Sequence, residues 1–350
     1  GVRVLRHPLY PDHSRSGIKR ALSYLSFMLV AAVLGPVLCG KTDILWVYHP
    51  PLTTGVAGWW LSLWRRAPFV YEIQDMWPES LTATGMISNK SILGVLGRIA
   101  RFIYRRARAM TVISPGFKEN LITKGVPPHK VHVVPNWTDE RIYGPTSRDV
   151  SVGQDFELAG RFNVVFAGNM GPAQGLQTVI EAAQQLLDVP EIQFVFIGDG
   201  LALQGLQESA HGLSNVSFID RQPAENMPGF FAWADALLVH LRSDPLFAIT
   251  IPSKTLAYLA SGRPIICAVA GDGAEVVRQA NAGLICPPED PDALAKTVRT
   301  LYTMQPAERE AMGEAGRQAY LAHYRREKAV DRYEQLFEEI HLRRNSRLKR

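Results

Sequence analysis

Residues 164–175 read VVFAGNMGPAQG, an apolar run that enters a glycine-rich turn, and a helical pattern begins at Leu176. A buried strand, a tight turn and a helix in this order form the repeating unit of a parallel α/β sheet. Gly168, Gly171 and Gly175 permit tight turns and close backbone approach, so amide groups and the helix N-terminus can face a phosphate. The turn is neither a dinucleotide fingerprint nor a P-loop, because it lacks Gly-x-Gly-x-x-Gly and Gly-Lys-Ser/Thr.

The same alternation of short strand-like runs and longer helical runs continues through both halves of the chain. It predicts an α/β fold of two Rossmann-like domains, with a ligand cleft between them at the carboxyl ends of the strands. The expected strands are 44–48, 69–73, 109–113, 131–134, 163–167, 193–197, 216–219, 236–240 and 264–268. The expected helices are 21–38, 54–64, 92–106, 115–124, 176–187, 202–210, 255–260, 306–320 and 325–340.

The apolar pattern dissolves into polar residues between the two halves, with Gly144, Pro145 and Gly153. We interpret that stretch as an interdomain linker. The predicted organisation is an N-terminal domain over 1–140, a linker over 141–161, a second domain over 162–322, and a C-terminal helix with a basic tail over 323–350.

The composition of the 350 residues is that of a globular protein, because 47% are apolar and 20% are charged, which excludes disorder and a fibre. The net charge of +5 conceals a split: residues 1–140 carry +9, residues 141–340 carry −9, and the last ten residues carry +5. A basic front and a basic tail predict that one face meets something anionic. Three cysteines without metal or redox spacing favour a reduced, cytosolic compartment.

The stretch from Ala21 to Gly40 holds twenty residues without a charge, about the length that crosses a bilayer core. Polar residues within it and an acidic strand start at Asp43 argue against a span, so a buried or membrane-touching helix and a true span both remain open. A second apolar helix, Leu52 to Trp64, ends in Trp59, Trp60 and Trp64, followed by two arginines. Aromatic residues beside arginine are typical of an interfacial anchor, and a tryptophan-rich core helix is the alternative.

Two further turns in the second half suit an anion. Gly198-Asp199-Gly200 ends the next strand, and Thr250-Ile251-Pro252-Ser253-Lys254 opens a helix in which Pro252 fits the first turn. Ser253 and Lys254 present a hydroxyl and an ammonium at a positive helix end. A turn closed by an Asx hydrogen bond is the alternative at Asp199. Three such turns on one sheet edge favour a phosphorylated ligand.

In the first half, Asp75 and Trp77 follow directly on a buried strand. A carboxylate beside an aromatic ring suits a sugar, and the alternative is that Asp75 caps the next segment. The histidines lack the His-Glu-x-x-His spacing of a metal site, and no Gly-x-Ser-x-Gly elbow supports a serine hydrolase.

Several motifs in one order resemble those of the retaining family 4 glycosyltransferases of the GT-B fold, and among them the bacterial fucosamine-type transferases of O-antigen and capsule assembly. The resemblance covers nearly the whole chain. It rests on 20–27 (RALSYLSF), 50–52 (PPL), 74–80 (QDMWPES), 134–137 (VPNW), 166–171 (FAGNMG) with Gln174 and Gly175, 198–200 (GDG), 250–254 (TIPSK) and 262–264 (GRP).

The resemblance implies a nucleotide-sugar donor, expected to be UDP-linked and N-acetylated, as co-substrate, with no metal ion or other cofactor. The C-terminal domain would hold the donor through Gly168, Asn169, Gly171, Gln174, Gly175, Gly198, Asp199, Ser253 and Lys254. Asp75 would act as the catalytic residue. Fixed cations and amides around Lys254 would stabilise the leaving diphosphate as a metal does elsewhere.

Two departures from the family pattern stand out. The family's two glutamates, separated by seven residues, would fall at Ile249 and Ala257. The second is expected to hold the donor ribose, so donor affinity or identity could differ here. The chain also begins where family members have already built a first strand, a glycine-rich loop and a helix, so an incomplete, N-terminally truncated domain is expected.

The expected function is sugar transfer onto a polyprenyl-diphosphate-linked saccharide in cell-surface polysaccharide synthesis. The expected place is the cytoplasm, peripheral on the inner face of the bacterial inner membrane. Partners would be the nucleotide-sugar, this acceptor and an anionic membrane surface, but no nucleic acid. The alternatives are a nucleotide-sugar epimerase of the same fold and an inactive pseudo-transferase that binds without turnover.

Overall fold

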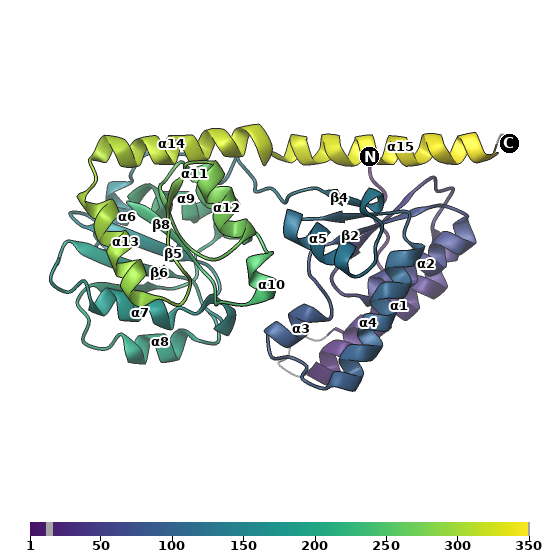
Figure 1. The fold of residues 1–350 in the computed structure, drawn as a ribbon, viewed down its shortest axis with the longest axis horizontal. Helices are drawn as coiled ribbons and strands as arrows, with labels where there is room; N and C mark the ends of the chain where they lie inside the picture. The colour runs from purple at the N-terminus through teal and green to yellow at the C-terminus, as the bar shows by residue number, and fades with distance from the viewer. Residues whose placement is uncertain (12–16, 349–350) are drawn as a thin grey trace. The chain divides into compact units, whose positions relative to one another are not determined.

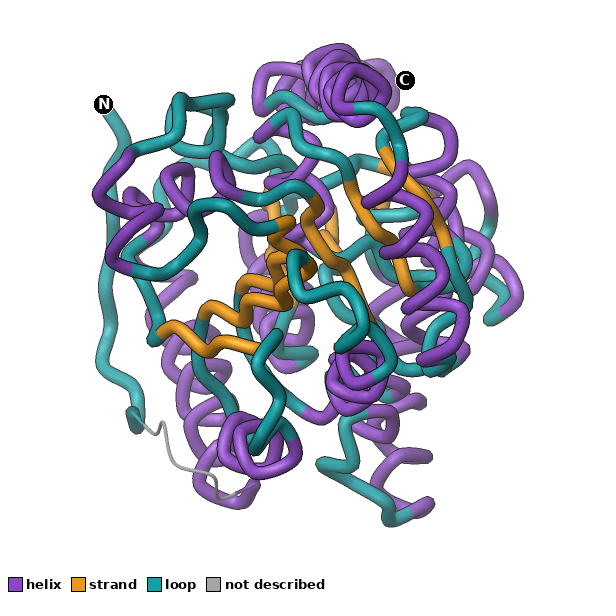
Figure 2. Tube along the Cα trace, turned by 90° about the vertical axis from the view of Figure 1, so that its left-hand side faces the viewer, coloured by secondary structure: helices purple, strands orange, loops and turns teal. Residues whose placement is uncertain are grey.

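The computed structural model describes residues 1–11 and 17–348, which form two compact units. Unit 1 comprises residues 1–134 together with the C-terminal segment from Val330, and unit 2 comprises Pro135–Ala329. Within each unit the strands lie inside and the helices outside (Figures 1 and 2). Each unit is an α/β layer structure, as the alternating pattern predicts.

Unit 1 is built on a parallel sheet of order β1-β2-β3-β4. All five residues of β2 are buried, which explains their continuous apolar pattern. Ser114 caps α5 by accepting a hydrogen bond from the Phe117 amide at 3.1 Å, with Pro115 in the first turn. The elements are α1 (Gly17–Leu38), β1 (Leu45–His49), α2 (Thr53–Arg65), β2 (Phe69–Ile73), α3 (Glu79–Ala83), α4 (Lys90–Arg106), β3 (Ala109–Val112), α5 (Pro115–Thr123), η1 (Pro128–Lys130) and β4 (Val131–Val133).

The last helix, α15 (Arg326–Leu348), covers part of this sheet although it lies at the other end of the sequence. Leu336 and Ile340 are buried in one cluster with Val70 and Ala109, and Tyr333 meets Trp46 edge to face. The helix continues beyond the expected end at residue 340, and the Arg344 guanidinium donates to the Asp43 carbonyl at 2.8 Å. The basic tail is thus the continuation of α15 as far as Leu348, and Lys349 and Arg350 lie outside the described residues.

Helix α1 is not a core helix. Its segment Lys19–Leu38 is long and apolar enough to cross a membrane, with a mean hydropathy of 2.0, but none of that window is buried. The buried alternative for this stretch is therefore wrong. The helix begins at Gly17, four residues earlier than the apolar pattern predicts.

Unit 2 contains a six-stranded parallel sheet of order β10-β9-β8-β5-β6-β7. Its elements are α6 (Val150–Asp155), β5 (Phe162–Ala167), η2 (Pro172–Gln174), α7 (Gln177–Gln184), β6 (Ile192–Ile197), α8 (Leu203–Ser209), β7 (Val216–Ile219), η3 (Ala224–Asn226), α9 (Met227–Trp233), β8 (Ala236–His240), α10 (Pro245–Ala248), α11 (Ser253–Ser261), β9 (Ile265–Ala268), α12 (Asp272–Gln279), β10 (Gly283–Ile285), α13 (Pro291–Thr303) and α14 (Pro306–His323).

The stretch interpreted as a linker, 141–161, packs within unit 2. It contains α6, and the Trp233 indole donates to the Asp149 carbonyl at 2.8 Å. The Arg148 guanidinium lies 4.9 Å from the Trp233 ring. The observed division therefore falls at Val134–Pro135, earlier than the predicted linker. Polar composition alone does not distinguish a connector from a surface segment that is fastened by a few side chains.

Candidate functional site

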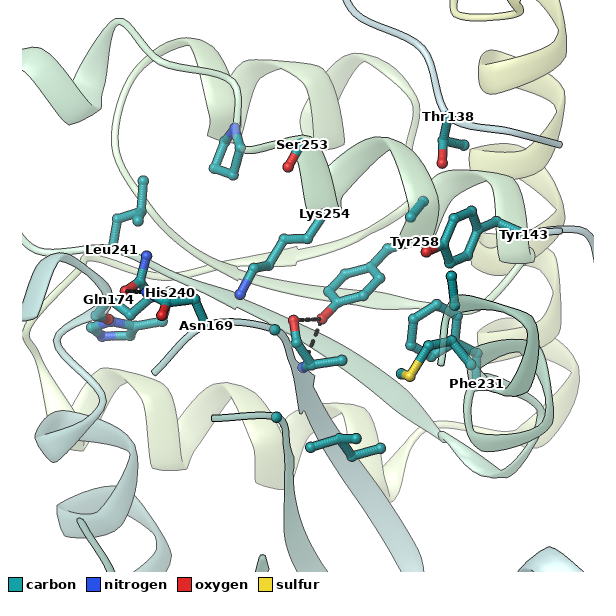
Figure 3. Close-up of a pocket in the computed structure, with 18 of the residues that line it drawn as sticks. Thr138, Tyr143, Asn169, Gln174, Phe231, His240, Leu241, Ser253, Lys254 and Tyr258 are labelled. Atoms are coloured by element: carbon teal, nitrogen blue, oxygen red, sulfur yellow. Dashed lines mark hydrogen bonds between the residues drawn. The ribbon is translucent and has the colours of Figure 1, made fainter. Parts of the chain in front are cut away.

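Unit 2 contains a pocket of about 840 Å³ at the carboxyl ends of β5, β6 and β8. Ligands of open parallel sheets bind at this edge, because the loops that follow the strands converge there. Aromatic side chains of Trp137, Tyr143, Phe231 and Phe247 are among its lining residues, and the Tyr143 and Phe231 rings stack with their centroids 6.1 Å apart. Figure 3 shows Tyr143 and Phe231 at one end of the pocket and Gln174 and His240 at the other.

Most of the residues expected to bind a donor line this one pocket: Gly168, Asn169, Gln174, Gly198, Asp199, Ser253 and Lys254. The three anion-friendly turns predicted from separate parts of the sequence are thus brought together. Gly171 and Gly175 are not among the lining residues. They shape the turn instead, since Gly175 adopts a left-handed conformation with a φ of 57°.

The backbone amides of the first turn are largely engaged within the protein. The Gly168 amide donates to the Ile197 carbonyl at 2.9 Å, and the Met170 amide donates to the Asp199 carbonyl at 2.7 Å. The Gly171 amide donates to Gln174 Oε1 at 3.0 Å. At these positions the amides bond to the end of β6, to the turn that follows it and to the Gln174 side chain instead of forming the expected cradle, and Lys254 contributes positive charge to the pocket.

The turns after β5 and β6 pack backbone against backbone. Gly198 has a φ of 139°, and a Cβ at this position would overlap the Gly168 carbonyl oxygen. Only glycine satisfies both conditions. This contact holds the two turns together at the pocket floor.

Lys254 is a buried cation of the site. Its side chain extends from the start of α11 toward Asn169 and Gln174 (Figure 3), and Nζ lies 3.5 Å from the centroid of the Phe166 ring. Nζ is buried and has no hydrogen-bond partner among the described residues. Burial lowers the Lys254 pKa from 10.5 to about 7. A buried ammonium without a counter-ion costs free energy, so this site favours an anionic ligand.

His240, at the end of β8, is a site residue that the sequence analysis did not select. Its Nδ1 lies 2.6 Å from the Gln174 carbonyl oxygen, which fixes the ring, and its Nε2 is buried without a partner among the described residues. Burial lowers its pKa, and the nearby Lys254 lowers it further. An isolated histidine at a strand end carries no sequence signal, so only the fold reveals that it borders the pocket.

Tyr258 clamps the end of β5 from α11. Its hydroxyl accepts from the Ala167 amide at 3.0 Å and donates to the Ala167 carbonyl at 3.4 Å (Figure 3). The neighbouring Ala257 lines the pocket, as expected for the position where the family pattern places a glutamate. Ile249, the other departure, is not among the lining residues.

Asp75 belongs to unit 1 and lies just beyond β2. The Trp77 indole donates to Asp75 Oδ2 at 3.3 Å, and burial raises the Asp75 pKa. Asp75 does not cap the following helix α3, whose N-cap position is Pro78. His49 lies beneath this pair, with its ring centroid 5.9 Å from that of Trp77, and burial lowers its pKa to about 3. A neutral histidine, an aromatic ring and a carboxylate are thus assembled at the carboxyl ends of β1 and β2.

Comparison with known proteins agrees with this architecture. Residues 161–304 match the family of glycosyl transferases group 1, and residues 1–137 match the glycosyl transferase 4-like domain. These two matched segments correspond closely to the main parts of units 2 and 1.

Curated relatives include a protein named as glycosyltransferase WbjE of Pseudomonas aeruginosa, 29% identical over 75% of this chain and 64% of its own length. Another is named as the colanic acid biosynthesis glycosyl transferase WcaI of Escherichia coli K12, 28% identical over 74% of this chain and 65% of its own length. The chain therefore spans slightly less than two thirds of the length of these relatives.

Among solved structures, the Anabaena protein Alr3699/HepE in complex with UDP superposes with a TM-score of 0.72 at 18% identity, covering 91% of this chain and 83% of that one. Sucrose-phosphate synthase from Thermosynechococcus elongatus superposes with a TM-score of 0.70 at 17% identity, covering 95% and 80%. At these identities the likeness establishes the fold, which is GT-B.

Proposed function

From the premise that the chain is a family 4 glycosyltransferase of the GT-B fold, we propose that it moves a sugar from a UDP-linked, N-acetylated donor onto a lipid-linked saccharide. The product would be a precursor of a bacterial cell-surface polysaccharide such as O-antigen or capsule, in the manner of the fucosamine-type transferases. The reaction would retain the anomeric configuration and need no metal ion.

The single observation that carries the donor proposal is the buried, unpartnered Lys254 Nζ in the pocket of unit 2. A diphosphate supplies the counter-charge that Lys254 lacks, and the pocket volume of about 840 Å³ suits a ligand as large as a nucleotide-sugar. The aromatic lining residues, such as Tyr143 and Phe231, offer flat surfaces for a nucleotide base. The Anabaena neighbour was solved in complex with UDP, and UDP is the donor nucleotide that we propose here.

The proposed chemistry breaks the bond between the anomeric carbon of the sugar and the β-phosphate oxygen. The acceptor hydroxyl attacks the same face, and its proton passes to the departing phosphate oxygen. Negative charge grows on the diphosphate as the bond breaks, so protonated Lys254 stabilises the transition state more than the ground state. His240 Nε2 lies in the same pocket, and because Nδ1–H donates to the Gln174 carbonyl, the neutral ring presents Nε2 to a ligand as a hydrogen-bond acceptor, for example for a sugar hydroxyl.

The acceptor proposal rests on the group at the carboxyl ends of β1 and β2. Asp75 is held by the Trp77 indole, and its carboxyl group can orient the reacting hydroxyl through a hydrogen bond while the hydroxyl proton passes to the departing phosphate. Buried His49 supports the Trp77 ring edge to face. We assign Asp75 to contact with the reacting hydroxyl and His49 to positioning.

A lipid-linked acceptor requires the protein to work at a membrane. We place it in the cytoplasm, peripheral on the inner face of the bacterial inner membrane. The basic balance of residues 1–140, at +9, supports an anionic lipid surface as a partner, and the net −9 of residues 141–340 gives no support for nucleic acid.

Calorimetric titration of the protein with UDP, GDP and inorganic diphosphate, in EDTA, tests the donor proposal. We expect UDP to bind most tightly, and Lys254→Met to weaken both UDP and diphosphate. Binding of neither nucleotide would contradict the proposal. Tighter binding of GDP than of UDP would still agree with a transferase, but would show that its donor is GDP-linked.

One observation favours a second candidate, a module that binds a nucleotide-sugar without transferring it. Ala257 lines the pocket where the family pattern places the glutamate expected to hold the ribose. Incubation of a radiolabelled UDP-sugar with membrane lipid extract separates the two. Transfer of the label into the lipid fraction would support the transferase. Binding of the donor without transfer of label to any acceptor in the extract would support the binding module.

A further inference from the structure

A stripe of large apolar side chains runs along the outer face of α1. Leu22, Leu25, Leu29, Val33 and Val37 recur at spacings of three or four residues, so they share one face of the helix. Their exposed fractions are 50%, 43%, 58%, 69% and 78%. An isolated exposed leucine is ordinary in a soluble protein, but a continuous stripe over four helical turns marks an interaction surface.

The opposite face of α1 is fastened to α2 along its length. The Thr53 hydroxyl donates to the Tyr24 carbonyl at 3.3 Å near the start, and the Arg65 guanidinium donates to the Pro36 carbonyl at 2.7 Å near the end. Arg65 also donates to the Cys39 carbonyl. These pairs join residues 26 to 29 positions apart, so the two helices run parallel.

A further hydrogen bond from α2 compensates for a proline inside α1. Pro36 lies inside α1 and has no amide hydrogen, so the Ala32 carbonyl one turn earlier has no donor within the helix. The Trp60 indole of α2 donates to that carbonyl at 3.1 Å. The partner helix therefore satisfies a group that would be left unpaired in the hydrocarbon of a bilayer.

This fastening favours a helix that lies in the membrane plane over one that spans. α2 connects directly to β1 and β2, so α1 crosses a bilayer only by breaking every tie to α2 and leaving the Ala32 carbonyl unpaired in lipid. Lying flat, α1 keeps these bonds on its inner face and offers only the apolar stripe to the membrane.

The exposed end of α2 is also apolar, and basic side chains lie at the ends of both helices. Trp60, Leu63 and Trp64 are 39%, 53% and 63% exposed, and the Trp60 and Trp64 rings lie 6.0 Å apart. Tryptophan prefers the headgroup boundary. Residues 17–66 contain five basic side chains, Lys19, Arg20, Lys41, Arg65 and Arg66, and a single acid, Asp43.

We infer that the α1 stripe and the exposed end of α2 form a surface that inserts in plane into the headgroup boundary of an anionic bilayer. The inference rests on the membrane partner of the proposed function and names the residues that meet it. The membrane would have to offer acyl chains to the apolar stripe and anionic headgroups to the basic side chains at the ends of the two helices. Each basic side chain near such a surface adds to the attraction.

Flotation with vesicles of phosphatidylethanolamine, with and without phosphatidylglycerol, tests the inference on the full chain. The variant Leu29→Asp/Val33→Asp should lower the vesicle-bound fraction by about tenfold or more, because two apolar side chains lose their burial. The matched control Val150→Asp/Leu201→Asp changes residues of similar exposure, 66% and 65%, in unit 2 and should float like wild type. Lys41→Glu/Arg66→Glu should reduce only the gain from phosphatidylglycerol.

Two measurements do not depend on a destabilising variant. Alkaline carbonate should release the wild-type protein from vesicles, whereas retention would indicate a span and overturn the in-plane arrangement. Brominated lipids should quench wild-type tryptophan fluorescence, and Trp64→Phe, which leaves the Trp60 bond to Ala32 in place, should lose a large part of that quenching. A wild type that does not float, or a stripe variant that floats as well as wild type, would overturn the surface.

UDP titration in solution separates this inference from the proposed function. The stripe variant should bind UDP as wild type does, because its changes lie in unit 1 and the pocket lies in unit 2. If the protein floats but does not bind UDP, the membrane surface stands and the proposed donor is rejected. If it binds UDP but does not float, the proposed donor stands and the membrane surface is rejected.

Discussion

At the scale of single residues, the proposed donor pocket depends on Lys254, a buried lysine whose charged form an anionic ligand would stabilise. Burial lowers the pKa of Lys254 to about 7, because it disfavours the charged form. A diphosphate beside Nζ favours the charged form and raises that pKa. Binding at a pH above 7 is therefore coupled to the uptake of a proton.

The first prediction is that UDP affinity falls as the pH rises from 7.5 to 9. The phosphate's second ionisation, near pH 6, is complete by then, so Lys254 is the group expected to change. The fall should approach about tenfold per pH unit until the pH reaches the pKa of the complex. Calorimetry in buffers of different ionisation enthalpy measures the proton taken up.

Lys254→Met provides the control for this prediction. It should weaken UDP binding by about 1.5–3 kcal/mol, the typical contribution of a hydrogen bond to a charged group. The remaining affinity should not depend on pH over the same range. If the UDP affinity of the wild-type protein is equally independent of pH, Lys254 does not contact the diphosphate.

The second prediction concerns Ala257, which lines the pocket where the family pattern has a glutamate. Ala257→Glu should tighten UDP binding by about tenfold, because a carboxylate accepts strong hydrogen bonds from the ribose hydroxyls. Ala257→Gln, of equal size but uncharged, should gain less. An unchanged affinity in calorimetry would show that this pocket does not use the family's ribose contact.

At the scale of elements, the turns after β5 and β6 act as one piece because their backbones touch. Gly198 adopts a φ of 139° and leaves no room for a Cβ beside the Gly168 carbonyl. The site is thus shaped by a contact between two turns that are thirty residues apart in the sequence.

The third prediction is that Gly198→Ala destabilises unit 2 by about 2 kcal/mol or more, since the strained backbone alone costs on the order of 1–3 kcal/mol. UDP binding should weaken with it. Gly205→Ala is the matched control, because Gly205 lies in α8 with nothing within 4 Å of its added Cβ. That change should stabilise the helix by about 0.5–1 kcal/mol, and urea unfolding measures both.

Elements with a strong local pattern were predictable from the sequence. Every expected strand is present with its ends within one residue, because buried parallel strands read as continuous apolar runs. The short strand β10 was missed, since Gly283–Ile285 is too brief to stand out. Helix α13 was also missed, although Asp290 caps it by accepting from the Ala293 amide at 2.8 Å.

The candidate site was predictable where a turn carries glycine or a charge, as at Gly168, Gly198 and Lys254. It was not predictable at His240 or Tyr258, whose roles depend on which strand ends lie side by side. The sequence also could not show which amides of the first turn are free to face a ligand. It does not reveal, for example, that the Gly171 amide already donates to Gln174 Oε1.

At the scale of the whole molecule, unit 1 is assembled from two parts of the chain that are far apart in sequence. The segment from Val330 packs on the sheet through Leu336 and Ile340, and Tyr333 meets Trp46. Glu72 is buried beneath it with a raised pKa, caused mainly by burial and opposed by hydrogen bonds to Gln74 and Tyr333. The last helix is therefore structural for the first unit.

The fourth prediction is that Leu336→Ala lowers the stability of unit 1 by about 2–5 kcal/mol, the usual cost of a cavity at a buried leucine. Leu342→Ala, on the same helix but 67% exposed, should change it by less than about 0.5 kcal/mol. UDP affinity, a property of unit 2, should stay the same in both variants. Calorimetric unfolding that shifts equally for the two would contradict this role of α15.

The composition of unit 1 has a consequence for synthesis on the ribosome. The sheet residues of unit 1 leave the ribosome first, but the helix that covers them follows only after all of unit 2 has been translated. At about 5–20 residues per second that interval is roughly ten to forty seconds, during which Val70 and Ala109 lack their cover from Leu336 and Ile340. Unit 2 has its whole sequence in one stretch and can fold without waiting. The unit that is made first is thus the last to be completed.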